Sequence, residues 1–132
     1  MATIFTRIIN GEIPCYKVAE NDRYFAFLDI NPMTKGHTLV IPKVEDDYIF
    51  HLDDDTYCGL TLFAKKVAAA IEKAVPCKRI GVAVMGMEVP HTHIHLIPIN
   101  KESDMIISNP KLHLPESEMQ QIANAIAANF KE

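Results

Sequence analysis

Three histidines occupy alternate positions within one short apolar segment of the chain. The segment reads Val89-Pro90-His91-Thr92-His93-Ile94-His95-Leu96-Ile97-Pro98. Side chains two positions apart on a β-strand point to the same face, so a strand here places all three imidazoles in one row. Histidines on a solvated strand face would have polar neighbours, whereas these neighbours are apolar. The segment therefore predicts a β-sheet that carries a chemical site on one face.

Two chemistries suit such a row: metal ligation and nucleophilic attack. Successive residues on one face of a strand are about 6.8 Å apart, which separates the backbones of His91 and His95 by about 13 Å. A zinc ion takes its nitrogen ligands at about 2.0 to 2.1 Å, so this strand supplies at most two of them. A metal would also need His37 or a carboxylate. In the second chemistry His93 attacks an electrophile such as phosphorus, while its neighbours orient it and move protons.

Length and charge exclude several classes of protein. The chain has 132 residues and a net charge of −4, with 13 basic against 17 acidic side chains. This size suits one compact domain, and we expect residues 1–132 to form it. The negative charge disfavours nucleic-acid polymers and anionic membranes as partners, and no apolar run approaches the length of a membrane span. The cysteines form no Cys-x-x-Cys pair, which is typical of reduced, mostly buried thiols in the cytoplasm: Cys15, Cys58 and Cys77.

The spacing of apolar residues and of helix caps predicts a mixed order of helices and strands. The expected helices are a short one at 4–9 that stops at Asn10-Gly11, a long one between Asp53 and Pro76, and one after Pro115. The expected strands are 15–19 and 24–28 as a hairpin, 37–41, and 80–85 and 91–99 as antiparallel neighbours. Residues 100–115 are expected to form a loop. This order predicts an α+β fold with an antiparallel sheet.

The run from His91 to Ile97 resembles the His-φ-His-φ-His-φ-φ motif of the histidine triad (HIT) family of nucleotidyl hydrolases and transferases, where φ is an apolar residue. Three more segments are similar to that family: 3–14 to its amino-terminal helix, and 25–32 and 36–43 to the two strands that follow. The resemblance covers most of residues 3–99 and is strongest to the Hint-type purine nucleoside phosphoramidases. Residues 100–132, with the carboxy-terminal loop and helix, are the least similar part.

The resemblance implies an HIT-like fold, with an antiparallel sheet of about five strands, two main helices, a short amino-terminal helix, and a sheet that continues across a homodimer. It also implies a cleft for a purine nucleotide such as AMP or GMP, and no cofactor. His93 matches the nucleophile that becomes nucleotidylated, His95 and His37 match residues that contact the phosphate or the leaving group, and His91 matches the orienting member. Asp29 matches the carboxylate that accepts the ribose hydroxyls. The apolar lining around the base corresponds to Ile4, Phe5, Ile8, Ile13, Phe27, Ile30 and Leu39.

Two departures from the family pattern bear on activity and on metal. Before the triad the family commonly has Gly, Gln, a variable residue and Val, and this chain has Gly86, Met87, Glu88 and Val89 there. The resemblance implies that Glu88 and Val89 contact the substrate. A carboxylate there repels a phosphate by Coulomb's law. Some bacterial-type members hold a structural zinc with two cysteines and a histidine, and those positions are Thr3, Thr6 and Glu45 here. We therefore expect no metal.

The resemblance and the residues together predict a hydrolase of nucleoside 5′-monophosphate derivatives that cleaves P–N bonds and prefers adenine. One alternative is a dinucleoside polyphosphate hydrolase of the same superfamily. Another is a nucleotide-binding regulatory module with weak or no catalysis, which Met87 and Glu88 favour. A metal-dependent hydrolase is a further alternative. The isolated residues His51 and His113 are expected on the surface.

Overall fold

A computed structural model describes residues 2–132 of the chain. The three helices are α1 (Ile4–Ile9), α2 (Asp54–Ala74) and α3 (Glu116–Asn129), and the five strands are β1 (Lys17–Glu20), β2 (Tyr24–Leu28), β3 (Thr38–Pro42), β4 (Arg79–Ala83) and β5 (Ile94–Ile99). Two short 3-10 turns, Ile49–His51 and Glu102–Met105, complete the elements. The mixed α+β class is thereby confirmed.

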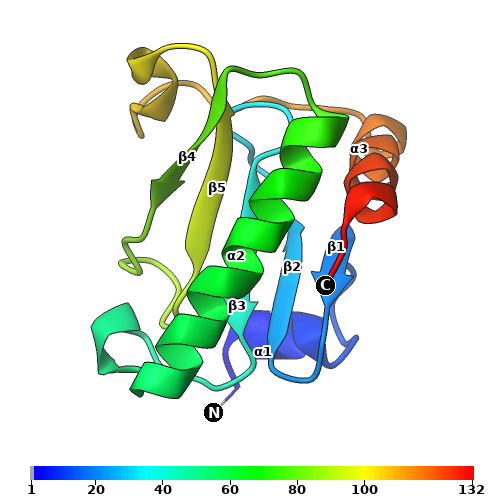
Figure 1. Ribbon diagram of the computed structural model, residues 1–132. Helices are drawn as coiled ribbons and strands as arrows, with labels where there is room; N and C mark the ends of the chain where they lie inside the picture. The colour runs from blue at the N-terminus through cyan, green and yellow to red at the C-terminus, as the bar shows by residue number, and fades with distance from the viewer. Residues whose placement is uncertain (1) are drawn as a thin grey trace.

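The five strands form one antiparallel sheet in the order β1-β2-β3-β5-β4. β1 and β2 form the predicted hairpin, and β4 and β5 are the predicted antiparallel neighbours. In Figure 1, α2 and α3 lie in front of the sheet and α1 lies behind it. The order leaves β4 and β1 as the two edge strands, and it places β3 beside β5, so that His37 and the histidine row meet.

Local sequence explains where the helices begin and end. The Asp53 side chain accepts the N–H of Thr56 at 2.7 Å at the start of α2, and the helix ends two residues before Pro76. Thr3 caps α1 in the same way, accepting the N–H of Thr6 at 3.1 Å. After α1 the chain reverses at Gly11, whose φ of +79° is favourable only for glycine.

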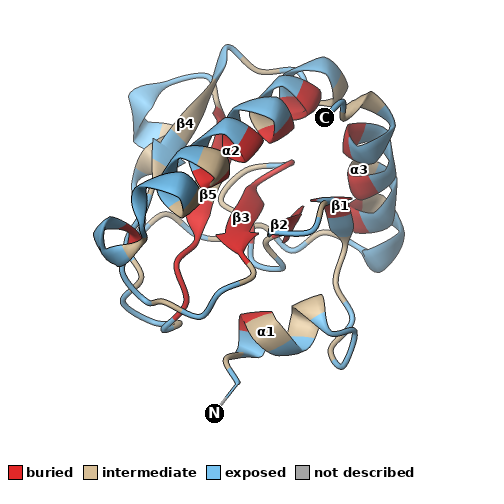
Figure 2. Ribbon diagram, turned by 60° about the horizontal axis from the view of Figure 1, so that its bottom comes forward, coloured by how far each residue is buried: buried red, intermediate tan, exposed pale blue. Residues whose placement is uncertain are grey.

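Apolar packing on both faces of the sheet explains why β2 and β3 are buried along their whole length. The larger core lies between the sheet and the two long helices. The smaller one lies under α1 and consists of Phe5, Phe25, Phe27, Leu39 and Ile41. Figure 2 shows α1 set apart from α2 and α3, with buried and half-buried positions along it. The short helix thus closes one end of the face that carries the histidines.

Three sequence expectations differ from the structure. The strand expected at 91–99 begins only at Ile94, because the N–H and the hydroxyl of Thr92 both bond to the carbonyl of Asp46 and not to a neighbouring strand, and the strand expected at 80–85 spans Arg79–Ala83. The expected loop at 100–115 contains the 3-10 turn Glu102–Met105. The thiols are not mostly buried: Cys58 is exposed on α2, and Cys15 and Cys77 are half-buried. Among the helices of residues 2–132, none has the length and apolarity that a membrane span needs.

Candidate active site

A cleft of about 510 Å³ opens on the sheet face that α1 partly covers. Its floor carries three of the four predicted catalytic histidines, and two loops form its walls. One wall is the β4–β5 loop and the other is the segment that precedes α3. The lining residues are Asp29, Asn31, Met33, His37, Met85, Gly86, Met87, Glu88, His93, His95, Ile107 and Lys111.

The hydrogen bonds of His37 and His95 determine which nitrogen of each ring carries the proton. The backbone N–H of Met33 donates to Nδ1 of His37 at 3.0 Å, so the neutral ring carries its proton on Nε2. That Nε2 lies 2.9 Å from Nδ1 of His95 and donates to it. His95 therefore carries its own proton on Nε2, where it is free to donate to a bound ligand.

The same reasoning assigns the tautomer of His93. Its Nδ1 lies 2.7 Å from the backbone carbonyl oxygen of His91, which can only accept, so Nδ1 carries the proton. Nε2 of His93 is then left with an unshared lone pair. The ring is packed edge-on against His95 and Phe5, with centroid distances of 5.0 and 5.1 Å. This arrangement fixes the orientation of the imidazole, and in its neutral form the ring presents the Nε2 lone pair as the nucleophile.

His91, the first histidine of the row, is fully buried, and hydrogen bonds to both ring nitrogens fix its position. Its Nε2 donates to the carbonyl of Pro42 at 2.8 Å, and its Nδ1 accepts from the hydroxyl of Thr3 at 2.8 Å. The Glu45 carboxylate in turn accepts the N–H of Thr3 at 2.7 Å and the hydroxyl of Thr6 at 2.6 Å. The three residues at the family's zinc-ligand positions thus meet around His91 as a hydrogen-bonded cluster. Two hydroxyls in place of thiolates do not fit a zinc site.

Burial favours the neutral form of three histidines: His37, His95 and His91. Desolvation lowers the pKa of His37 to about 3, with a smaller contribution from His95, and lowers the pKa of His95 to about 4. Burial also lowers the pKa of His91. The hydrogen bond to the His91 carbonyl orients the ring of His93.

Asp29 lies next to His37, at the end of the histidine cluster that is farther from Phe5. Its Oδ1 accepts the N–H of Asn31 at 2.9 Å, and its Oδ2 lies 3.7 Å from Nε2 of His37. Burial raises the pKa of this carboxyl, and the Asn31 N–H opposes that rise. Oδ2 has no donor as close as the Asn31 N–H, so it is available to accept hydroxyl groups of a ligand.

Two clusters within residues 2–132 bring three metal-ligating groups together, and neither fits a metal well. Asp29, His37 and His95 offer atoms within 4.8 Å of one another. A metal on Nε2 of His37 requires a proton on Nδ1, yet Nδ1 faces the N–H donor of Met33, so two donors would oppose each other. The other cluster lies at the surface and consists of the half-buried Asp46 with the exposed Asp47 and His51.

Comparisons with known proteins agree with this geometry. The HIT domain model matches residues 10–102. The chain belongs to the HIT family. It is 34% identical over 134 residues to the adenosine 5′-monophosphoramidase of Schizosaccharomyces pombe, covering 99% of this chain and 100% of that protein.

Solved structures of HIT proteins share the fold over nearly the whole chain. The structure of a Hit-like protein from Bartonella henselae, involved in cell-cycle regulation, superposes with a TM-score of 0.85 at 32% identity, covering 97% of this chain and 96% of that one. A zinc-bound histidine triad protein from Mycobacterium smegmatis gives a TM-score of 0.78 at 25% identity, covering 97% and 95%. The HIT-like fold expected from sequence is therefore confirmed.

The structure places the predicted site residues of this HIT protein in three groups. His37, His93 and His95 share the cleft with Asp29 and Glu88, and His91 lies directly beneath them. The expected base lining divides: Phe5, Phe27 and Leu39 are buried in the core under α1, where Ile8 and Val89 pack against them. Ile13 is half-buried, while Ile4 and Ile30 are 49% and 69% exposed.

Sequence reasoning missed several residues that line the cleft of this HIT protein. Asn31 and Met33 contribute through backbone N–H groups, which leave no trace in side-chain chemistry. Ile107 and Lys111 come from the segment with the least family resemblance. Met87 was noted only as a departure from the family pattern, and Met85 and Gly86 were not expected to line the cleft. The one available signal was the lysine itself, which together with Lys101 supplies the two lysines of the segment 100–115.

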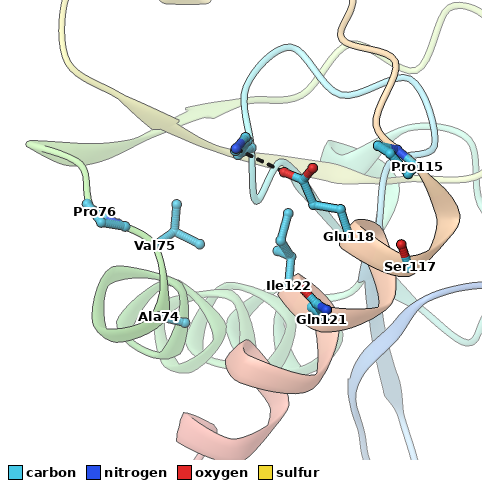
Figure 3. A pocket seen from close by; sticks show the side chains of 9 residues that line it. Ala74, Val75, Pro76, Pro115, Ser117, Glu118, Gln121 and Ile122 are labelled. Atoms are coloured by element: carbon cyan, nitrogen blue, oxygen red, sulfur yellow. Dashed lines mark ion pairs between the residues drawn. The ribbon is translucent and has the colours of Figure 1, made fainter.

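A second hollow lies between the end of α2 and the start of α3, on the opposite side of the sheet. Figure 3 shows Glu118 at its centre, in an ion pair with Lys35 at 2.9 Å. The remaining lining is apolar or amide and hydroxyl in character, with no histidine or cysteine among its residues. His51 and His113 are exposed, as expected. The triad cleft is therefore the candidate active site.

Proposed function

We propose that this HIT protein hydrolyses purine nucleoside 5′-monophosphate derivatives, phosphoramidates above all, through a covalent intermediate on His93. The observation that carries the proposal is the hydrogen bond from Nδ1 of His93 to the His91 carbonyl, which leaves the Nε2 lone pair free. The fission-yeast relative is named an adenosine 5′-monophosphoramidase, which supports this substrate class.

The proposed reaction has two displacements at phosphorus. Nε2 of His93 forms a bond to the α-phosphorus while the P–N bond to the leaving amine breaks, and the departing nitrogen takes a proton from water at the open side of the cleft. A second water then attacks the phosphorus while the bond between phosphorus and Nε2 breaks and its electron pair returns to Nε2. The proton of this water goes to the hydroxide that the first step left, and AMP is released. Nε2–H of His95 donates to a phosphoryl oxygen and stabilises the charge that develops there.

Asp29 and the surface near α1 suit a nucleoside. A carboxylate with one oxygen held by Asn31 and the other available accepts the two ribose hydroxyls. Ile30 is 69% exposed and Ile4 is 49% exposed, which is unfavourable for isoleucine in water. Both side chains are therefore accessible to a purine base in the expected position.

Glu88 favours a second candidate, a nucleotide-binding module with weak or no catalysis. Its carboxylate lines the same cleft as the histidines. A phosphate that enters the cleft is repelled by this charge unless water or a cation lies between them. Binding would then rely on Asp29 and the base contacts, and chemistry would be slow.

We also propose that two copies pair through β4. This edge strand exposes backbone groups on its outer side, and Val82 on it is 62% exposed. Leu62 on α2 is 57% exposed. Antiparallel pairing of two β4 strands would satisfy the free backbone groups and continue the sheet. Replacing Val82 by Lys should shift the mass measured by light scattering from dimer to monomer.

The deciding experiment compares wild type with His93→Ala on a fluorogenic adenosine 5′-phosphoramidate, with and without EDTA. We expect EDTA-resistant amine release by wild type and none by the variant, while AMP still binds to both. The matched control is His113→Ala, which removes an exposed imidazole outside the cleft and should retain turnover. Full turnover by His93→Ala would refute the assigned nucleophile. AMP binding without turnover by wild type would favour the binding module.

A further inference from the structure

Glu45 lies on the loop that follows β3 and is not one of the residues that line the triad cleft. Its carboxylate is exposed, yet one oxygen, Oε2, accepts both the N–H of Thr3 at 2.7 Å and the hydroxyl of Thr6 at 2.6 Å. Hydrogen bonds to an ionised carboxylate are short and about twice as strong as neutral ones. The Thr6 hydroxyl and the Thr3 N–H lower the pKa of Glu45, so the group stays ionised at neutral pH. This surface carboxylate therefore binds the start of α1.

The helix that Glu45 binds is too short to be stable by itself. α1 has six residues, and its only buried side chain is Phe5. Isolated helices of fewer than about 12 residues are marginal in water, so α1 depends on contacts with the rest of the protein. In the described part of the chain, the hydrogen bonds that join its first turn to distant segments run to Glu45 and to His91. The position of α1 thus depends on these bonds and on the packing of Phe5.

The same helix contacts the histidine row at two points. The hydroxyl of Thr3 donates to Nδ1 of His91 at 2.8 Å. The ring of Phe5 packs edge-on against the rings of His91 and His93, with centroid distances of 5.7 and 5.1 Å. Because the carbonyl of His91 accepts Nδ1–H of His93 at 2.7 Å, contacts that fix His91 also fix the ring that carries the nucleophile. Glu45 is thereby linked to His93 through α1.

We propose that Glu45 is a positioning residue for the nucleophile: it holds α1 against the histidine row and so keeps the imidazole of His93 in its reactive orientation. The inference rests on the proposed function and deepens it. The role requires an oxygen that accepts two hydrogen bonds at this point, because the two donors belong to Thr3 and Thr6. A glutamine amide oxygen can accept both, whereas alanine accepts neither. Both substitutions remove the charge, so they separate positioning from an effect of charge alone.

The first test measures turnover of the adenosine 5′-phosphoramidate and the Kd for AMP. We expect Glu45→Ala to lower kcat about tenfold and to change the Kd for AMP less, because attack at phosphorus depends on the orientation of the ring. Glu45→Gln should restore most of kcat. Asp47→Ala, which removes another exposed carboxylate of the same loop, is the matched control and should keep the wild-type kcat. An unchanged kcat in Glu45→Ala, or a loss confined to the Kd for AMP, would overturn the proposal.

The second test uses nitrogen-15 NMR of the imidazoles, which needs no turnover. In wild type we expect a protonated Nδ1 on His93 and a hydrogen-bonded, unprotonated Nδ1 on His91. Glu45→Ala should shift the His91 Nδ1 resonance toward that of an unbonded nitrogen and leave the resonances of the exposed His113 in place. Thr6→Val, which removes one of the two bonds to Glu45, should shift the His91 resonance in the same direction.

Unchanged resonances of His91 and His93 in both variants would overturn the proposal, even if kcat fell, because Glu45 would then act on turnover without moving the row. Circular dichroism at the assay temperature checks that each variant is folded. Absence of turnover by wild type would contradict the proposed function. The resonances would still decide the role of Glu45, so the two failures are distinguishable.

Discussion

Protonation of buried histidines should make this protein lose stability between pH 7 and pH 5. His37 is 2% exposed, and burial lowers its pKa to about 3, whereas an imidazole in the unfolded chain has a pKa of about 6.5. The unfolded state thus binds more protons in this range, and stability rises with pH. The contribution of His37 is fully present above pH 6.5 and is lost as the pH falls toward 3.

The size of the effect follows from the unfolded-state pKa alone, as long as the folded pKa lies well below 5. At pH 5, protonation stabilises the unfolded state by about 2 kcal/mol per such histidine, against about 0.2 kcal/mol at pH 7. Replacing His37 by Gln keeps a hydrogen-bond donor toward His95 and removes the titration. Wild type should therefore lose about 2 kcal/mol more than His37→Gln between pH 7 and pH 5.

Urea unfolding followed by circular dichroism at both pH values measures this difference, at one fixed protein concentration because association also affects stability. With a slope of about 1 to 3 kcal/mol/M, the wild-type midpoint should fall by about 1 M more than that of the variant. His113→Gln, which removes an exposed imidazole, is the matched control and should follow wild type. Equal pH dependence of wild type and His37→Gln would refute the argument from burial.

Three further changes test other parts of the structure. Thr3→Val removes the cap of α1 and the hydroxyl that donates to Nδ1 of His91. It should lower the free energy of unfolding by about 1 to 2 kcal/mol in a urea titration, and it should also lower kcat. An unchanged kcat would show that Thr3 does not position the histidine row. A Cβ on Gly59 would lie 2.0 Å from the hydroxyl of Tyr24, so Gly59→Ala should cost about 1 to 3 kcal/mol, and less in a Tyr24→Phe background; equal costs in both would contradict this contact. Glu88→Gln should raise kcat/KM about fivefold, because it removes roughly 1 kcal/mol of repulsion between the carboxylate and the phosphate of the substrate. High salt screens this repulsion, so the difference between the variant and wild type should disappear there. A fall in kcat/KM would mean that Glu88 assists the reaction.

Features that depend on neighbours in sequence could be predicted well. The cap at Asp53, the stop before Pro76 and the turn at Gly11 are local effects of side chains on the adjoining backbone, and all three are as expected. The alternation of His91, His93 and His95 predicts one shared face because strand geometry repeats every two residues, and the rings of His93 and His95 do pack against each other.

The boundaries of the central strands and half of the cleft could not be predicted in this way. β5 begins at Ile94 because Thr92 bonds to Asp46, a residue 46 positions earlier. The wall with Ile107 and Lys111 is placed by the bond between Leu112 and Pro32. Contacts of this kind form only in the folded chain, and no periodic pattern in the sequence predicts them.

The sequence by itself determined the chemical groups of this protein and the face on which they lie: a row of imidazoles within an antiparallel sheet, with a carboxylate and a fourth histidine on neighbouring segments. Only the tertiary structure decided their protonation. Met33 donates to His37, His37 to His95, and His93 to the His91 carbonyl, and these bonds leave a lone pair on one ring and a donor on another. The physical reason is that a neutral imidazole has two equivalent choices for its proton, and its hydrogen-bond partners, distant in sequence, select between them.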